Sequence, residues 1–351
     1  MANRAGGAFL LVALGGCGGA GAVLGSDPAP EPKSACDAPC VFHVAGDGSF
    51  EVRDGPADEA AFSLPRDVDV DAAGRLFVVD AMAHSVRMIE GGVVRTIAGG
   101  GHGGFRDGPI GEAAFSNPAG IAVDPAGRIL IADADNHRVR RIDLDAGTVT
   151  TLVGLGRPGF RDGSPETALL NHPVDVAVDA AGNIYIVDLD NFAIRMLSVD
   201  GELLTLAGAP TSLDIERPRF VAVGPSGAVY FTDGERHLVK KIDRLSRLVT
   251  IAGTALPGMI DGDTASSKLR SPTGIAVDRE ERIFVADSDN HLIRMISRGV
   301  VHAIAGTGYI GGTDGPASRA SFWKPLGIAL GPGGELFVTD AQLANIRCVR
   351  L

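Results

Sequence analysis

The sequence has 351 residues, of which 45% are apolar and 21% charged, so it can bury a sizeable core and is not disordered as a whole. No apolar run reaches the ~20 residues that a membrane-spanning helix needs, which excludes a polytopic membrane protein. The net charge of −11, from 32 basic and 43 acidic residues, argues against a nucleic-acid partner, because phosphate binding depends on basic patches.

The first residues have the layout of a signal peptide, which we place at 1–16. Arg4 precedes the apolar stretch 8–14, which is too short to span a bilayer. The following Leu14-Gly15-Gly16-Cys17 resembles the lipobox of bacterial lipoproteins. This resemblance implies that Cys17 is lipidated and becomes the new N-terminus, whereas ordinary cleavage near residues 20–22 is the alternative. We therefore expect export to the cell envelope and a lipid anchor on the periplasmic or outer-membrane face.

Residues 17–40 form a tether rich in Gly, Ala and Pro, and they contain Cys36 and Cys40. Oxidation is permitted in an exported protein, so we predict a local disulfide between these two cysteines. Pairing of Cys40 with Cys348 is the competing possibility. Zinc is not expected, because two cysteines without a nearby histidine pair do not complete a tetrahedral site.

Six units of similar sequence, 45 to 55 residues apart, fill the remainder of the chain, residues 41–351. Each unit contains four short strands rich in β-branched residues, joined in part by tight turns such as Asp124-Pro125-Ala126-Gly127. Six such units predict an all-β fold, a six-bladed β-propeller of four-stranded antiparallel blades. The units begin at the leading prolines Pro65, Pro118, Pro173, Pro218, Pro272 and Pro325.

The two ends of the repeat array complement each other. The last unit ends after its third strand, at residues 345–350, and the pattern of a fourth strand appears instead at residues 41–46. Pairing of this N-terminal strand with the last unit would close the ring and remove the exposed strand edges. We therefore predict that strand 41–46 completes the C-terminal blade, and we expect a monomer.

The units resemble the NHL repeat, named for the tripeptide that stands here as Asn290-His291-Leu292. The resemblance extends over residues 41–351. It implies a six-bladed propeller used mainly to bind other molecules. The RNA-binding basic face of some family members is not matched in this acidic chain.

Each unit also repeats an Asp at the end of its second strand, with a cation seven residues later. A single ring does not need six copies of one active site, so we interpret these as structural ion pairs across a hairpin. The predicted pairs are Asp80–Arg87, Asp133–Arg140, Asp188–Arg195, Asp233–Lys240, Asp287–Arg294 and Asp340–Arg347. Asp-Gly pairs also recur in five of the long connections, but none of these loops has a full calcium ligand set. They begin at Asp54, Asp107, Asp162, Asp261 and Asp314.

Function is expected where the repeats differ. The long connections between blades share one face of a propeller with the turns between second and third strands, and we predict that ligands bind there. Near the start of the innermost strands, the units differ from one another in the polar or bulky residues that they carry. These ligand-binding candidates are Arg66, Asp67, His172, Asp175, Arg219 and Phe220.

Two functions follow from this pattern. The first is a non-catalytic binding scaffold without cofactor or metal, whose partner is a protein, a glycan or a small molecule. The alternative is a metal-dependent hydrolase or lyase of the six-bladed propeller type. It would need Asp67, His172 and Asp175 to converge on a metal at the channel mouth.

Overall fold

The computed structural model describes residues 39–208 and 214–351. The predicted signal peptide at 1–16, the lipidation site Cys17 and most of the tether, including Cys36, lie outside these residues. Their assignments stay predictions. Across the described ranges there is no helix with the length and apolar character needed to cross a membrane.

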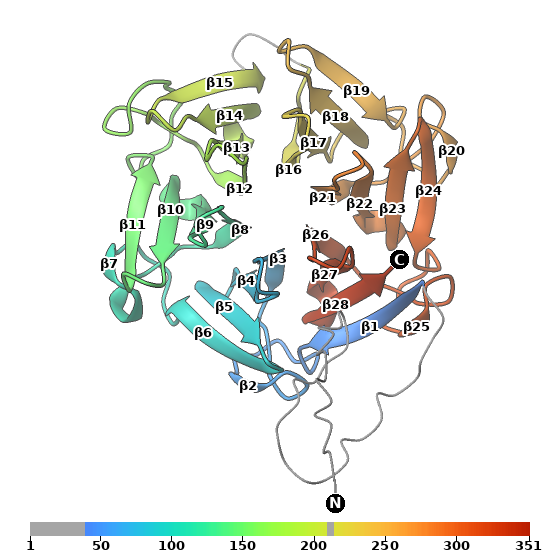
Figure 1. The fold of residues 1–351 in the computed structure, drawn as a ribbon, viewed down its shortest axis with the longest axis horizontal. Coiled ribbons are helices and arrows are strands. Elements are labelled where there is room, and N and C mark those ends of the chain that lie inside the picture. The colour runs from blue at the N-terminus through green and yellow to red at the C-terminus, as the bar shows by residue number, and fades with distance from the viewer. Residues whose placement is uncertain (1–38, 209–213) are drawn as a thin grey trace, which may run out of the picture.

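Six antiparallel β-sheets stand around a central axis, which confirms the predicted six-bladed propeller (Figure 1). Blades 1 and 2 consist of β3 (Pro65–Val70), β4 (Leu76–Asp80), β5 (Ser85–Glu90), β6 (Val93–Gly99), β8 (Pro118–Val123), β9 (Ile129–Asp133), β10 (Arg138–Asp143) and β11 (Thr148–Val153). Blades 3 and 4 consist of β12 (Pro173–Val178), β13 (Ile184–Asp188), β14 (Ala193–Leu197), β15 (Leu203–Gly208), β16 (Pro218–Val223), β17 (Val229–Asp233), β18 (Leu238–Ile242) and β19 (Leu248–Ala252). Blades 5 and 6 consist of β21 (Pro272–Val277), β22 (Ile283–Asp287), β23 (Leu292–Ser297), β24 (Val300–Ala305), β26 (Pro325–Leu330), β27 (Leu336–Asp340), β28 (Asn345–Arg350) and β1 (Cys40–Ala45).

The ring is closed by strand β1, as the sequence predicts. In Figure 1, β1 lies beside β28, and the two strands pair antiparallel with Phe42 opposite Cys348. The strand begins one residue earlier than expected, at Cys40, and ends at Ala45. Both edges of the repeat array are thereby paired, which removes the free edges that an open array would expose.

Four blades carry a fifth strand that the repeat pattern does not predict. The glycine of the Asp-Gly pair and the residue after it add to the outer strand of the blade. These short strands are β2 (Gly55–Pro56), β7 (Gly108–Pro109), β20 (Gly262–Asp263) and β25 (Gly315–Pro316). Five 3-10 turns complete the regular structure, η1 (Ile110–Glu112), η2 (Ala134–Asn136), η3 (Leu189–Asn191), η4 (Ser288–Asn290) and η5 (Ala341–Leu343).

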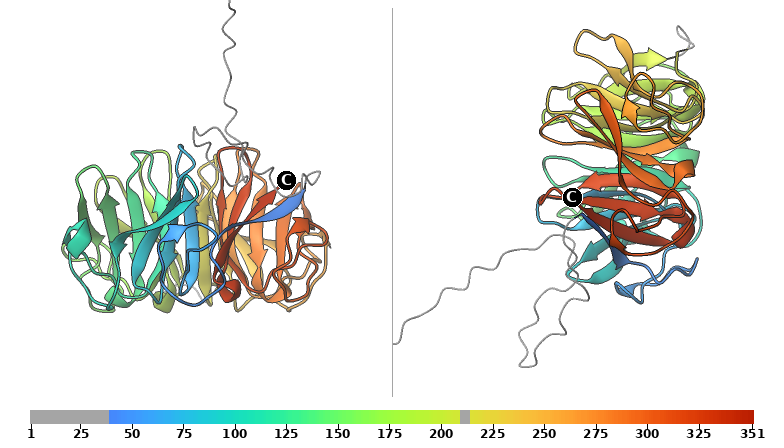
Figure 2. Two further views of the ribbon diagram at one scale, coloured as in Figure 1. Left: turned by 90° about the horizontal axis from the view of Figure 1, so that it is seen from below. Right: turned by 90° about the vertical axis from the view of Figure 1, so that its right-hand side faces the viewer.

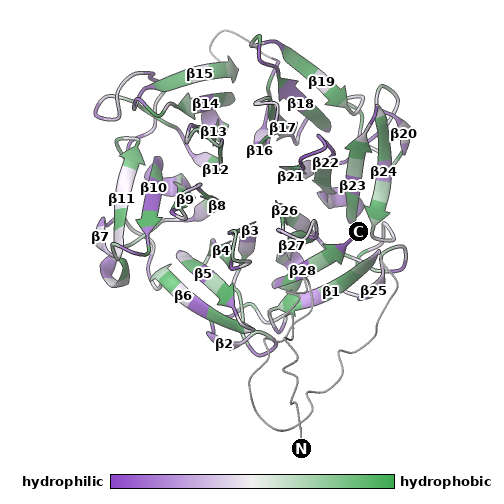
Figure 3. Cartoon of the chain, viewed as in Figure 1, coloured by the Kyte–Doolittle hydropathy of each residue, from purple (hydrophilic) through white to green (hydrophobic). Residues whose placement is uncertain are grey.

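The core lies between the blades. Every residue of the second strand of each blade is buried, because its two faces pack on the neighbouring blades. One cluster, for example, joins Ala122 and Leu130 of blade 2 to Val176 and Ile186 of blade 3. Figure 3 shows this apolar character along the strands of all six blades. Burial on both faces explains why the strands read as apolar runs without clean alternation.

In five blades the repeated Arg is fully buried and lies between two carboxylates. Its guanidinium nitrogens contact the Asp at the end of the second strand at 2.5–3.8 Å. The same guanidinium contacts the Asp of the Asp-Gly pair in the preceding long connection. We call these five sites the guanidinium clamps, formed around Arg87, Arg140, Arg195, Arg294 and Arg347.

Blade 4 differs from the other five. Nζ of Lys240 donates to the carbonyl of Asp214 at 2.7 Å, while the Asp233 carboxylate accepts the backbone amides of Glu216 and Arg217. The connection before β16 lacks the Asp-Gly pair that supplies the second carboxylate in the five clamps.

The propeller has two unlike faces, seen from the side in Figure 2. The connections between blades and the turns between second and third strands lie on one, which we call the long-loop face. The opposite face carries the tight turns, such as the one after β8, where Asp124 accepts the backbone amides of Ala126 and Arg128.

Cys40 at the start of β1 pairs with Arg350 at the end of β28. The chain therefore enters the ring on the face opposite the long loops.

Candidate functional site

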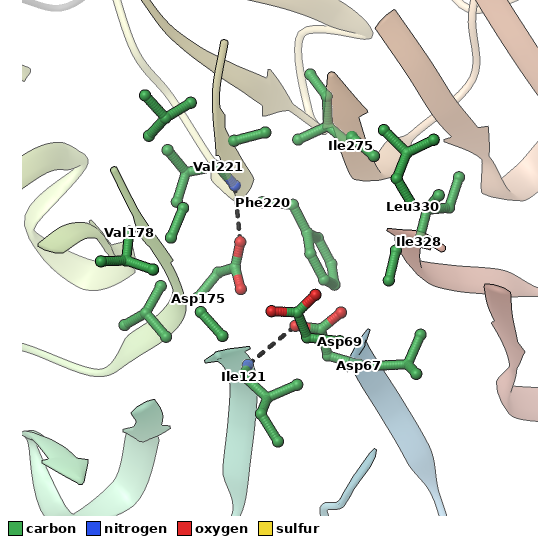
Figure 4. A pocket seen from close by; sticks show the side chains of 18 of the residues that line it. Asp67, Asp69, Ile121, Asp175, Val178, Phe220, Val221, Ile275, Ile328 and Leu330 are labelled. Atoms are coloured by element: carbon green, nitrogen blue, oxygen red, sulfur yellow. Dashed lines mark hydrogen bonds between the residues drawn. The ribbon is translucent and has the colours of Figure 1, made fainter. Parts of the chain in front are cut away.

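The innermost strands of the six blades surround a central cavity with an empty volume of about 720 Å³. At one end it is bounded by Asp67, Asp175 and Phe220, which lie two residues after the leading proline of their strands. Because the innermost strands start at the long-loop face, this end of the cavity lies toward that face. Figure 4 shows the three side chains converging from different blades. We call these three residues, together with Arg66 and Arg219 beside them in sequence, the channel mouth, although neither arginine is among the residues that line the cavity.

Three glycines at the same register position make room for these side chains. A Cβ on Gly120 would overlap the backbone and carboxylate of Asp175, and one on Gly327 would overlap Asp67. A Cβ on Gly274 would overlap the backbone of blade 6. Six side chains as large as Asp or Phe would not fit around the axis. This register position is therefore glycine in three blades and Asp or Phe in the other three.

Asp67 and Asp175 each reach across to a neighbouring blade. Asp67 accepts the backbone amide of Ile121 at 3.0 Å, and Asp175 accepts that of Val221 at 2.7 Å. Both side chains are buried, and they hydrogen-bond to each other. Burial raises the pKa of Asp67 to about 7, and burial together with the Asp67 charge raises the pKa of Asp175 well above its ordinary value. Two carboxyls in contact do not both ionise, so the pair shares a proton near neutral pH.

A third carboxyl in the channel, Asp69, is absent from the predicted set. Its side chain accepts the backbone amides of Val123, on blade 2, and of Val70, at 2.7 and 2.8 Å. Burial raises its pKa to about 6. The other five innermost strands have alanine at this register position, so comparison of the repeats could have identified Asp69 in the same way as Asp67. The alanines are Ala122, Ala177, Ala222, Ala276 and Ala329.

Arg66 and Arg219 stand one residue after the leading proline, on the opposed blades 1 and 4. Neither guanidinium forms a hydrogen bond or an ion pair with any described residue, and Nε of Arg219 is buried without a partner. Burial lowers the pKa of both groups, and the nearby charges of Asp67 and Asp175 oppose this effect for Arg66. The charge of Arg66 also lowers the pKa of Arg219.

His172 is not among the residues that line the cavity. Its Nδ1 lies 3.6 Å from the Asp135 carboxylate, and its backbone amide donates to Nδ1 of His137. Within 39–208 and 214–351, no three His, Cys, Asp or Glu side chains are grouped so that they could hold a metal ion. The donor set that the hydrolase or lyase alternative requires is not assembled in that part of the chain.

The two described cysteines, Cys40 and Cys348, are both disulfide-bonded. Cys36 lies outside the described residues, so the predicted pairing of Cys36 with Cys40 is not tested here and stays a prediction.

Comparison with known proteins gives one family match. The model of the NHL repeat matches residues 115–142 and 269–294, which lie in blades 2 and 5. The chain therefore carries NHL repeats.

Curated relatives show similarity over most of this chain. Protein SUPPRESSOR OF QUENCHING 1, chloroplastic, of Arabidopsis thaliana is 30% identical over 284 residues, which cover 73% of this chain and 27% of that protein. NHL repeat-containing protein 2 of Homo sapiens is 26% identical over 338 residues, covering 82% of this chain and 46% of that protein. The chain thus spans less than half the length of either relative.

Among solved structures, an auxiliary nutrient binding protein from Bacteroides thetaiotaomicron VPI-5482 superimposes with a TM-score of 0.71. The match covers 92% of this chain and 78% of that protein. At 17% sequence identity it shows a common fold.

Proposed function

Starting from a chain that carries NHL repeats in a six-bladed β-propeller, we propose an exported, membrane-tethered binding protein that holds its ligand at the channel mouth without catalysing a reaction. The observation that carries this proposal is the contrast between the arginines. Those of the five clamps are enclosed by carboxylates, whereas Arg66 and Arg219 have no partner among the described residues. Cationic donors that a fold leaves unpaired are typical of a ligand site.

The path of the chain supports the tethered arrangement. The ring is entered at Cys40, on the face opposite the long loops. A lipid anchor at Cys17 would then direct that face toward the membrane and leave the long-loop face open to ligands. The auxiliary nutrient binding protein of the same fold supports a binding role, although its low identity does not identify the ligand.

Trp323, the single tryptophan of the chain, provides a test of this binding face. It lies just before β26 on the long-loop face, and 42% of its surface is exposed. We would record its emission while titrating the full chain with sugars, amino acids, organic acids and short peptides. Saturable changes in emission are expected for at least one class.

The matched control moves the reporter to the other face. In the variant Trp323→Phe/Leu245→Trp the tryptophan replaces a side chain that is 73% exposed in the tight turn between β18 and β19. This variant should show no response to the same ligand. A ligand that changes only the emission of the control variant would place binding on the wrong face and overturn the proposal. The tether is tested separately, since Cys17→Ser should move the chain from the membrane fraction to the soluble fraction.

A further inference from the structure

A second cavity lies between blades 2 and 3, which are neighbours in the ring (Figure 1). Its empty volume is about 650 Å³. Strands of both blades line it, together with residues of the tight turns 124–128 and 198–201, so it lies on the face opposite the channel mouth. Most of its lining side chains are aliphatic, among them Leu130, Leu152, Val178, Ile184, Leu197 and Val199.

The cavity coincides with the loss of an aromatic ring from the repeat. Leu130 is the second residue of β9 and is buried in the core that joins blades 2 and 3. The other five blades have Phe or Tyr at this position, and each ring packs between its own blade and the next. Leucine is smaller than either ring, so this interface keeps space that the others fill. The five rings are Phe77, Tyr185, Tyr230, Phe284 and Phe337.

A second departure from the repeat stands directly opposite the first. Arg141 of β10 pairs with Leu130 across the ladder and lines the cavity. In blades 1, 3 and 5 the same two positions pair an aromatic ring with a methionine. The residues at the register position of Arg141 are Met88, Met196, Lys241, Met295 and Cys348.

The polar groups at this position have no partner in the fold. No hydrogen bond or ion pair joins the Arg141 guanidinium to a described residue, and its Nε is buried. Thr150 lies opposite Arg141 on β11, and its Oγ1 is buried without a partner as well. Buried polar groups in native proteins are normally hydrogen-bonded, so an unpartnered guanidinium beside a cavity indicates a missing acceptor.

Arg141 is the uncompensated charge of the cavity lining. The other two charged lining residues neutralise each other, since Nε of Arg128 lies 2.7 Å from the Asp124 carboxylate. Glu166 and Glu202 adjoin lining residues in sequence, but both are exposed and neither lines the cavity. The Asp124–Arg128 pair belongs to the repeat, because equivalent pairs occur in blades 1 and 5 as Asp71–Arg75 and Asp278–Arg282.

We propose that this cavity binds a medium-chain fatty acid, with the carboxylate held by Arg141 and the chain by the aliphatic lining. A guanidinium fork matches the two oxygens of a carboxylate, and aliphatic walls favour methylene groups over water. A mostly apolar cavity with one placed charge is the usual form of a small-molecule site. The inference goes beyond the proposed function, because this cavity and the channel mouth lie on opposite faces.

The test is calorimetric titration of the full chain at pH 7 with hexanoate, hexanamide and acetate. Hexanoate should bind. Hexanamide keeps the chain without the charge, and it should bind about tenfold more weakly or worse. Acetate keeps the charge without the chain. Since each buried methylene contributes about fourfold, acetate should also bind at least about tenfold more weakly.

Two variants restore the repeat in blade 2. Arg141→Met introduces the residue of blades 1, 3 and 5, and it should weaken hexanoate binding about tenfold and remove the preference over hexanamide. Leu130→Phe introduces the ring of blades 1, 5 and 6, and it should abolish binding of both ligands without lowering the melting temperature. Lys241→Met is the matched control at the same register position in blade 4, where Nζ lies over the Tyr230 ring. It should leave hexanoate affinity unchanged within about twofold.

Four results would each overturn the inference. They are absence of hexanoate binding, equal binding of hexanamide or acetate, unchanged affinity in Arg141→Met, and an equal loss of affinity in Lys241→Met. If Leu130→Phe melts at a clearly lower temperature, Arg141→Met decides the question, because its methionine is already accommodated in three other blades. None of these outcomes affects the proposed function, which is tested at Trp323 on the other face.

Discussion

Arginine and aspartate occur together in two regions of this propeller, with opposite outcomes. In the guanidinium clamps, a buried arginine contacts two carboxylates, and the arrangement recurs in five blades. At the channel mouth, Asp67 and Asp175 form a buried carboxyl pair that shares a proton, and the neighbouring Arg66 and Arg219 have no partner among the described residues. The first region satisfies its charges within the fold. The second leaves two guanidinium groups without a described partner, at positions where the repeats differ.

Arg294→Ala should produce the largest loss of stability of the changes considered. Its guanidinium contacts Asp287 at 2.8 Å and also Asp261, and the side chain is fully buried. Removing it leaves two carboxylates without their cation, and breaking a buried pair costs about 3–5 kcal/mol. Chemical denaturation would measure this loss, while ligand binding at the channel mouth should be retained. An unchanged free energy of unfolding would contradict the structural role of the clamps.

Gly120→Ala tests the crowding at the channel mouth and should have the next largest effect. The added Cβ would overlap Asp175 and displace it from the amide of Val221. Overpacking of this kind costs about 2 kcal/mol. Gly111→Ala is the control, because no atom lies within 4 Å of its added Cβ. Equal stability of the two variants would show that the mouth tolerates a side chain at position 120.

The repeats and the closure of the ring could be predicted from the sequence because the pattern recurs six times. Each leading proline begins an innermost strand, and the N-terminal strand pairs with the last unit as predicted. The second carboxylate of each clamp could not be predicted in the same way. Asp54 lies 33 residues before Arg87, and the long connection that carries it gives no indication of where its carboxylate folds back.

At the channel mouth, the sequence identified which residues differ but not how they interact. The structure brings Asp67, Asp175 and Phe220 together and places His172 beside Asp135 instead. Contact between Asp67 and Asp175 depends on the curvature of the ring, which brings non-adjacent blades together at the axis. Asp69 is absent from the predicted set although the five alanines at its register position mark it as a departure from the repeat.

Asp67→Asn should change how stability depends on pH. The folded pKa of Asp67 is raised to about 7. Between the unfolded pKa of about 3.9 and that value, the folded state holds the additional proton, so stability falls as the pH rises, by up to about 1.4 kcal/mol per unit. The amide keeps the shape but does not titrate. The stability difference between wild type and variant should therefore shift in favour of the variant between pH 5 and 7.

Asp69→Asn is the comparison for this pH effect. The folded pKa of Asp69 is raised to about 6, so the corresponding change should be complete about one pH unit lower. Melting curves of the three proteins from pH 4 to 8 would distinguish these windows. A difference between wild type and Asp67→Asn that does not vary with pH would mean that the Asp67–Asp175 pair does not hold a proton in the folded protein.

The smallest effect considered concerns His237, which lies between β17 and β18, away from the channel mouth. Nδ1 of His237 accepts the backbone amide of Ser271, in the connection to blade 5, at 3.0 Å. His237→Ala removes this hydrogen bond and should lower the free energy of unfolding by about 1 kcal/mol. His237 has a φ of +56°, so His237→Asn, which tolerates that conformation, controls for backbone strain. If His237→Ala weakened ligand binding without reducing stability, repeated residues would also serve the site, and the division between clamps and mouth would be wrong.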